Sequence, residues 1–233
     1  MDIKDILITQ KRELGSKINE FYIDREGGNF TKTNSPLIKV IIGPRRSGKS
    51  FFALHHLADK KIKFGYVNFD DERLLDVKNY DDIINAVAQI YDNPKSLLLD
   101  EIQNLPNWEL FVNRLSRQGF DLFITGSNSN LLSKELASHL TGRHTAIPIF
   151  TFSFREYLAA YQIELTTSEK KTKLSDYILY GGYPEPLIKK LDYKDYISTL
   201  INSIIYKDII KRYKIRFVQG IENLTTYLLS NVA

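Results

Sequence analysis

The sequence predicts an α/β fold in which a parallel sheet carries helices on both faces. Two observations predict it. Over the first 150 residues, short apolar runs rich in β-branched residues alternate with segments of helical pattern, and this alternation is typical of parallel sheets. A glycine-rich stretch also joins the first apolar run to the helix after it. Beyond residue 150 the strand pattern stops, and the rest of the 233 residues is expected to be helical.

The expected elements follow from local patterning in chain order. Residues 1–25 form a helical preface that Gly15 should break, because glycine is a weak helix former. Strands are expected at residues 37–42, 64–69, 96–99, 121–125 and 145–149. Helices are expected at residues 51–57, 81–90, 108–118 and 131–140. Asn107 should cap the third of these helices, and Gly119 should end it.

The stretch after the first strand fits the phosphate-loop pattern G-x-x-x-x-G-K-[ST] at every fixed position. Its residues are Gly43, Pro44, Arg45, Arg46, Ser47, Gly48, Lys49 and Ser50. Glycine lets the backbone curl around phosphate oxygens, and the N-terminus of the next helix adds N–H donors. Lys49 would place its ammonium on the β- and γ-phosphates, and Ser50 would give its hydroxyl to Mg²⁺. The strand before and the helix after favour a nucleotide site over an ordinary glycine turn.

A second motif, Leu97-Leu98-Leu99-Asp100-Glu101, ends the third strand with two acids. Ligands of open α/β sheets bind at the carboxyl ends of the strands. Asp100 would hold Mg²⁺, directly or through water, and Glu101 is the natural general base for the attacking water. An Asp-Glu pair at a strand end can also be a solvated turn, but its position after a phosphate loop favours the functional interpretation.

Two further positions could complete an active site. The turn Thr125-Gly126-Ser127-Asn128 ends a strand that, in this type of sheet, lies between the other two site strands. Ser127 is the first choice to reach the γ-phosphate or the attacking water, with Asn128 and Thr125 behind it, although such residues also favour plain turns. Arg143 could stabilise transition-state charge on a phosphate bound by a neighbouring subunit, or it could cap the preceding helix.

Composition narrows the class of protein. The absence of cysteine excludes disulfides and cysteine zinc sites and fits a cytoplasmic protein. No apolar run approaches the roughly 18 residues of a membrane span, and the polar N-terminus is not a signal peptide. The net charge of +4 permits contact with nucleic acid. Residues 187–216 hold eight basic side chains against three acidic ones, which could touch DNA phosphates or form a solvated helix face.

The order of these motifs resembles the AAA+ division of phosphate-loop ATPases. More narrowly, the chain resembles a prokaryotic AAA+-like family whose members carry a C-terminal domain of unknown function with a winged-helix-like part. The matching segments are G-P-R-R-S-G-K-S at 43–50, L-D-E-I-Q-N-L-P-N-W at 99–108, T-G-S-N-S-N-L-L at 125–132, L-T-G-R at 140–143, F-S-F-R-E-Y-L at 152–158, Y-G-G-Y-P at 180–184 and K-D-I-I-K-R-Y at 207–213. They span nearly the whole chain.

The resemblance implies a particular architecture. It implies a five-stranded parallel sheet of order 5-1-4-3-2, followed by a helical lid and the start of a C-terminal domain. The corresponding boundaries are 1–150 for the nucleotide-binding domain, 151–191 for the lid and 192–233 for the C-terminal start. Relatives continue further, so the C-terminal domain is expected to be truncated here.

The resemblance also implies roles for individual residues. It casts residues 43–50 as the first nucleotide motif, and Asp100 and Glu101 as the second. Ser127 stands at the sensor position and Arg143 at the arginine-finger position. No clear arginine for a second sensor is found in the lid. Phe21 to Arg25 is a candidate adenine pocket by its position ahead of the first strand.

The expected function is Mg²⁺-dependent ATP binding and slow hydrolysis, coupled to work on DNA or a protein, with a homo-oligomer as the expected assembly. One alternative is a regulatory switch that binds ATP and rarely hydrolyses it. Another is a kinase for a small molecule or nucleotide. The Asp-Glu pair favours hydrolysis over the first alternative. The lack of an arginine-rich lid over a second substrate disfavours the second.

Overall fold

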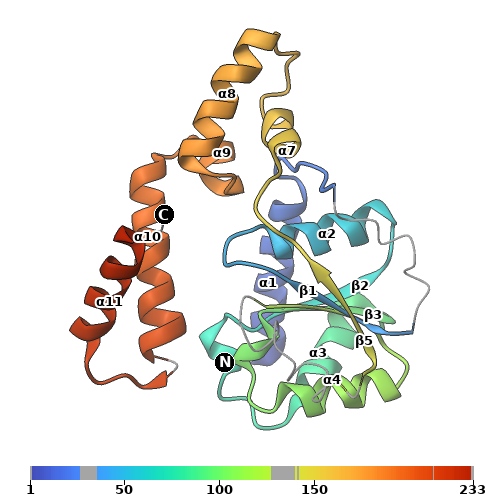
Figure 1. Cartoon of the computed structure of the whole chain (residues 1–233). Helices are drawn as coiled ribbons and strands as arrows, with labels where there is room; N and C mark the ends of the chain where they lie inside the picture. The colour runs from blue at the N-terminus through green and yellow to red at the C-terminus, as the bar shows by residue number, and fades with distance from the viewer. Residues whose placement is uncertain (1, 27–35, 127–139, 141, 212, 232–233) are drawn as a thin grey trace.

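A five-stranded parallel sheet forms the centre of the molecule (Figure 1). The computed structural model describes residues 2–26, 36–126, 140, 142–211 and 213–231. The strands are β1 (Ile38–Ile42), β2 (Phe64–Asn68), β3 (Ser96–Asp100), β4 (Asp121–Thr125) and β5 (His144–Pro148). They lie in the order β2-β3-β4-β1-β5, and every pair is parallel. The predicted fold class and the predicted strand order are confirmed.

Within the described part of the chain, four helices surround this sheet. They are α1 (Ile3–Ile18), α2 (Lys49–Asp59), α3 (Tyr80–Tyr91) and α4 (Trp108–Arg117), with short 3₁₀ turns at Glu72–Leu74 and Ile102–Asn104. Figure 1 shows α2 on one side of the sheet, with α3 and α4 on the other. Helix α1 packs along the edge strand β2 and touches both α2 and α3. The apolar strand residues are therefore covered on both faces, which explains why Leu97, Leu98 and Leu99 are fully buried.

One local prediction was wrong, and a second was confirmed in position but not in its hydrogen bond. Helix α1 runs through Gly15 without a break and ends at Ile18. Its buried face, which includes Leu7, Gln10 and Leu14, packs on the core, and this packing outweighs the cost of about 1 kcal/mol that one glycine imposes on a helix. Asn107 does precede α4, but it has a φ of 51° and its side chain makes no capping hydrogen bond.

The elements that the structure describes after residue 150 are all helices, joined by short loops. The elements are α7 (Phe154–Ala159), α8 (Thr167–Tyr180), α9 (Pro184–Lys189), α10 (Tyr193–Ser203), a π-helix η3 (Ile204–Lys211) and α11 (Val218–Ser230). Helices α7 and α8 each begin with a capping box. Figure 1 shows α8 and α9 above the sheet, while α10, η3 and α11 form an arm that descends beside it. Among the described residues no helix is long and apolar enough to cross a membrane.

Candidate nucleotide-binding site

The loop between β1 and α2 has a backbone that requires glycine at two points. Gly43 has a φ of 152°, and a Cβ built there would lie 1.9 Å from the backbone oxygen of Ile149. Gly48, with a φ of 91°, leads directly into α2. The first-turn N–H groups of that helix have no acceptor within the helix, so they face the loop as anion donors. The loop thus fits the phosphate group that its sequence predicts.

Lys49 lies at the start of α2 and is buried, with 4% of the residue exposed. Its Nζ donates a hydrogen bond to the backbone oxygen of Pro44, 2.8 Å away, and so crosses the loop. Burial lowers the pKa of Lys49, although the carboxylates of Glu101 and Asp100 act in the opposite direction. The ammonium is therefore held inside the loop, where it could donate hydrogen bonds to a phosphate.

Asp100 is the centre of a buried hydrogen-bond cluster at the end of β3. Ser50 Oγ donates to Asp100 Oδ1 at 2.7 Å, and Tyr66 OH donates to Oδ2 at 3.1 Å. The hydroxyl of Thr125, at the end of β4, also donates to Oδ1. Burial raises the pKa of Tyr66, and its contact with Asp100 adds to the effect, so the phenol stays a donor. Hydroxyl and carboxylate oxygens in contact fit the ligand preference of Mg²⁺.

Glu101 follows Asp100 and departs from the strand. Its φ of 50° is left-handed, and its backbone N–H donates to Thr125 Oγ1 at 3.2 Å. Gln103 Nε2 donates to Glu101 Oε2, which orients the carboxylate. Asp100 and Glu101 both border the cavity, and Asp100 lies beside Ser50.

The remaining predicted residues fall into three groups. Ser127 and Asn128 lie outside the described residues, as does most of the helix expected at 131–140. Arg143 is exposed just ahead of β5, and its backbone oxygen accepts from the N–H of Ile38 at 3.0 Å. It is not among the residues that line the cavity. Arg45 and Arg46 do line that cavity, and both form ion pairs with acids from the C-terminal helices.

The cavity has a volume of about 410 Å³ and joins the loop to three other parts of the chain. Its lining includes the segment before β1, the strands β2 and β3 at Tyr66 and Asp100, and helix α9. Phe21, Tyr22 and Ile23 contribute from the N-terminal segment, while Pro184 and Ile188 contribute from α9. The apolar end of the cavity is thus built from residues about 160 positions apart in the chain.

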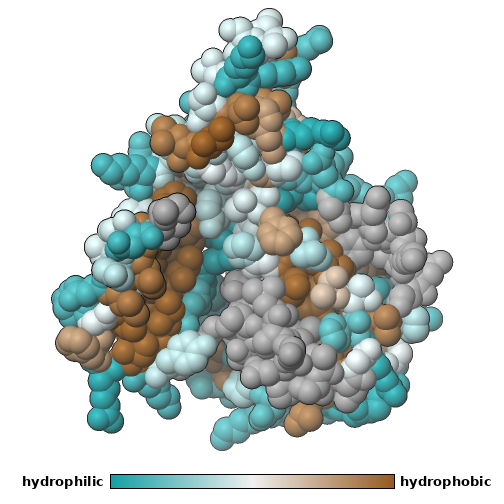
Figure 2. Space-filling view, viewed as in Figure 1, coloured by the Kyte–Doolittle hydropathy of each residue, from teal (hydrophilic) through white to brown (hydrophobic). Residues whose placement is uncertain are grey.

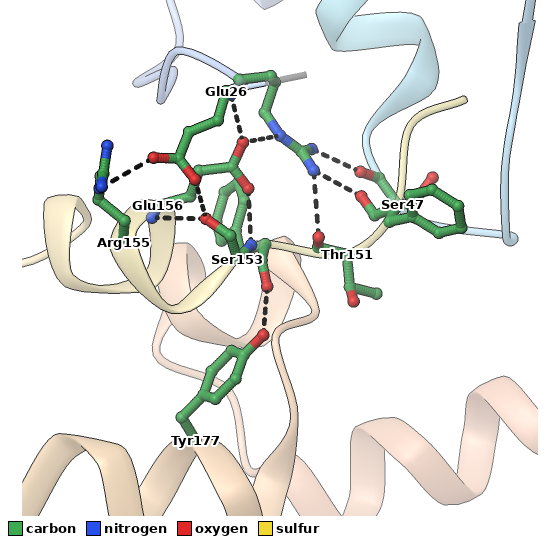
Figure 3. Close-up of polar contacts among 10 residues, drawn as sticks. Glu26, Ser47, Thr151, Ser153, Arg155, Glu156 and Tyr177 are labelled. Carbon is green, nitrogen blue, oxygen red and sulfur yellow. Dashed lines mark hydrogen bonds and ion pairs between the residues drawn. The ribbon is translucent and has the colours of Figure 1, made fainter. Parts of the chain in front are cut away.

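Arg25 is a residue that sequence reasoning placed only as one end of a candidate adenine pocket. Its guanidinium donates to Glu156 Oε1 at 2.9 Å, to the backbone oxygen of Ser47 at 2.9 Å and to that of Thr151 at 3.3 Å. Figure 3 shows these acceptors converging from the loop, the segment after β5 and helix α7. The side chains of Arg25 and Glu156 are each only 5% exposed. Because its partners are distant in sequence, no local pattern could have identified this cluster.

Replacing Arg25 with alanine is expected to lower the free energy of unfolding by about 3 kcal/mol, because the buried carboxylate of Glu156 would lose its counter-charge. Urea unfolding monitored by circular dichroism measures this change. Arg155→Ala is the matched control, since Arg155 pairs with Glu26 at the surface with its side chain 87% exposed. It should cost less than about 1 kcal/mol. Equal losses in the two variants would contradict the structural role of Arg25.

Comparison with known proteins agrees with this geometry. Residues 35–158, which contain β1 to β5 and the loop, match the family described as AAA domain. The chain belongs to the AAA domain family. This family is one of phosphate-loop ATPases, so the predicted nucleotide-binding class is confirmed at that level. The match includes the loop and both acids at the end of β3.

Several curated proteins are similar to this AAA domain chain over most of its length. The uncharacterized protein MJ1544 of Methanocaldococcus jannaschii is 38% identical over 209 residues, which cover 83% of this chain and 46% of that protein. An uncharacterized protein of Haemophilus influenzae is 32% identical over 211 residues, covering 85% and 52% respectively. The chain therefore spans about half the length of these curated relatives.

Proposed function

We propose that this AAA domain protein binds ATP with Mg²⁺ and hydrolyses it slowly, and that turnover drives a conformational change on a macromolecular target such as DNA. The observation that carries the proposal is the contact between Ser50 and Asp100 at 2.7 Å, beside the buried ammonium of Lys49. A metal-binding hydroxyl, a carboxylate and a phosphate-binding cation meet there at the mouth of a glycine loop. These are the parts that phosphoryl transfer from a nucleotide requires.

Each residue has a distinct role in this proposal. Lys49 and the N–H groups of α2 bind the β- and γ-phosphates. Ser50 and Asp100 would hold Mg²⁺, which when bound neutralises charge on the phosphate oxygens. Glu101 accepts a proton from the attacking water, and Gln103 keeps its carboxylate in place. Thr125 links the two acids, because it donates to Asp100 and accepts from the N–H of Glu101.

The apolar end of the cavity supports a position for the adenine base of the nucleotide. Tyr22, Ile23, Pro184 and Ile188 offer apolar and aromatic surface, and a flat purine ring suits such surroundings. The N-terminal segment and helix α9 would then both contact the nucleotide. An adenine ring bound between the N-terminal segment and α9 would favour a conformation in which α9 lies closer to the phosphate loop.

A second candidate function is a regulatory switch with little turnover. The observation that favours it is the pair of ion bridges from Arg45 and Arg46 to Asp208 and Glu185, which tie the loop to the C-terminal helices. A protein built only to report nucleotide occupancy would need such a connection. Turnover rate and its response to a target distinguish the two functions.

The purified protein should release phosphate from ATP in the presence of Mg²⁺ and stop when EDTA removes it. Measuring this steady-state rate with added double-stranded DNA, and without it, tests the proposal. Stimulation by DNA would support a motor that acts on DNA. Slow turnover that DNA does not change would favour the switch or a protein target. Hydrolysis that continues at the same rate without Mg²⁺ would contradict the assignment of Ser50 and Asp100 as its ligands.

A further inference from the structure

The phosphate loop is bonded to the C-terminal arm through one of its variable positions. Arg45 donates from Nε to Asp208 Oδ2 at 2.9 Å and from Nη2 to Oδ1 at 2.8 Å. The two residues are 163 positions apart, and their side chains are 27% and 19% exposed. A two-point contact between a guanidinium and a carboxylate has fixed geometry and is stronger than a single hydrogen bond. This pair therefore holds the arm against the loop.

Asp208 also acts on the cation that would bind phosphate. Arg45 and Lys49 both line the cavity, and burial lowers the pKa of Lys49, with a smaller contribution in the same direction from the charge on Arg45. The carboxylate of Asp208 acts on Lys49 in the opposite direction. Two cations thus lie within electrostatic reach of each other, and a carboxylate from the arm offsets their repulsion. That carboxylate is bonded to Arg45, and Arg45 lines the cavity into which a nucleotide would bring its own negative charge.

The element that carries Asp208 is unusual. Asp208 lies within η3, a π-helix of eight residues that continues directly from α10. π-helices are rare, are less favourable than α-helices and often occur at functional sites. Figure 1 shows this part of the arm beside the loop that precedes α2.

The neighbouring pair is less suited to such a role. Arg46 donates to Glu185 Oε2 at 2.8 Å, but their side chains are 42% and 31% exposed. Lys189 also contacts Glu185, at 3.0 Å, so this carboxylate keeps a cation if Arg46 leaves it. Exposed pairs of this kind contribute little to stability. The Arg45–Asp208 pair is therefore the more sensitive connection between the loop and the arm.

We propose that Asp208 competes with the terminal phosphate of a nucleoside triphosphate for Arg45, so that triphosphate binding releases the α10–η3–α11 arm and diphosphate binding does not. This inference rests on the proposed nucleotide site. A phosphate offers Arg45 the same two-point contact as a carboxylate, with more charge. Because coupling between two binding events is reciprocal, docking of the arm must weaken triphosphate binding by the same factor that triphosphate weakens docking.

The first test is the affinity ratio between a triphosphate and a diphosphate. Asp208→Asn removes the competing charge and keeps the shape of the side chain. Its affinity for adenylyl imidodiphosphate with Mg²⁺, measured by calorimetry, should rise about fivefold or more, while its affinity for ADP changes less than twofold. Asp195→Asn, at an exposed position on α10, makes the same charge change and should alter neither affinity.

A double-variant cycle shows whether the effect passes through Arg45. Arg45→Gln should lower the ratio of the affinity for the triphosphate analogue to the affinity for ADP. In that background, Asp208→Asn should not change the affinity for either nucleotide further. The guanidinium for which Asp208 and the terminal phosphate compete is then absent. An Asp208→Asn effect of equal size with and without Arg45 would overturn the proposal.

The second test follows the arm itself. The chain has no cysteine, so spin labels can be placed at Asp76→Cys and Thr226→Cys, which are exposed positions ahead of α3 and on α11. The triphosphate analogue should change the distance between the labels, and ADP should leave it unchanged. Asp208→Asn should show the changed distance before any nucleotide is added.

The outcomes separate this inference from the proposed function. A wild-type protein that binds neither nucleotide would remove the nucleotide site itself, and the inference with it. A protein that binds both nucleotides, with an affinity ratio and label distance that Asp208→Asn leaves unchanged, would overturn only the role of Asp208.

Discussion

Lys49→Ala is expected to lower the affinity for ATP at least about 100-fold, to the point where binding is lost in calorimetry at micromolar protein. Lys49 is the cation that the structure holds inside the glycine loop, with Nζ bonded to the backbone of Pro44. The β- and γ-phosphates would otherwise enter a loop whose remaining donors are uncharged N–H groups and two arginines, Arg45 and Arg46, that are paired with acids of the C-terminal helices. Removing the ammonium leaves those phosphates without their central counter-charge.

The same substitution should leave the fold intact. Burial lowers the pKa of Lys49, so the folded protein binds this proton less tightly than the unfolded chain does. The charged ammonium therefore opposes folding at neutral pH, and its removal is not expected to lower the melting temperature of the nucleotide-free protein. The melting temperature of the nucleotide-free variant therefore distinguishes a loss of binding from a loss of structure, which a binding measurement alone cannot do.

Lys95→Ala is a suitable control, because Lys95 is exposed and precedes β3 at the opposite end of the sheet. It should keep wild-type affinity. Thermal unfolding of both variants without nucleotide should give melting temperatures within a few degrees of wild type. If Lys49→Ala bound ATP as tightly as the control, the loop would not be the phosphate site.

The sheet and the phosphate site were predictable because their signals are local. Each strand is a short apolar run, and the residues of the glycine loop are adjacent in the chain, so spacing alone indicated where Lys49, Ser50 and Asp100 would meet. The alternation of strands and helices indicated a parallel sheet, whereas the order of its strands came from the resemblance to AAA+ ATPases. The boundaries of the five strands differ from the predicted ones by at most one residue at either end, and those of β4 are identical.

The contacts around the site were not predictable, because they join residues with no common pattern. Arg45 and Arg46 occupy variable positions of the motif, and nothing in the sequence points to Asp208 or Glu185 as their partners. A basic stretch around Asp208 suggested a solvated helix face, whereas this acid faces the loop. Tertiary packing also overrode propensity at Gly15, where the buried face of α1 maintains the helix.

Glu101→Gln is expected to retain ATP binding and to lower turnover by at least about 100-fold, the usual contribution of a general base. The amide has the same shape as the carboxylate but cannot accept a proton from water. Asp100, which would hold Mg²⁺ with Ser50, is unchanged. Its bonds to Tyr66 and Thr125 do not depend on the Glu101 side chain. Binding and catalysis should therefore separate in this variant.

Single-turnover hydrolysis and equilibrium binding, measured on the same preparation, test this separation. Glu109→Gln on α4 provides the matched control, since it makes the same chemical change away from the cavity and should keep wild-type turnover. A Glu101→Gln protein that hydrolysed ATP at the wild-type rate would show that another group activates the water. Loss of both binding and turnover would instead place Glu101 among the residues that organise the loop, because its backbone N–H already bonds to Thr125.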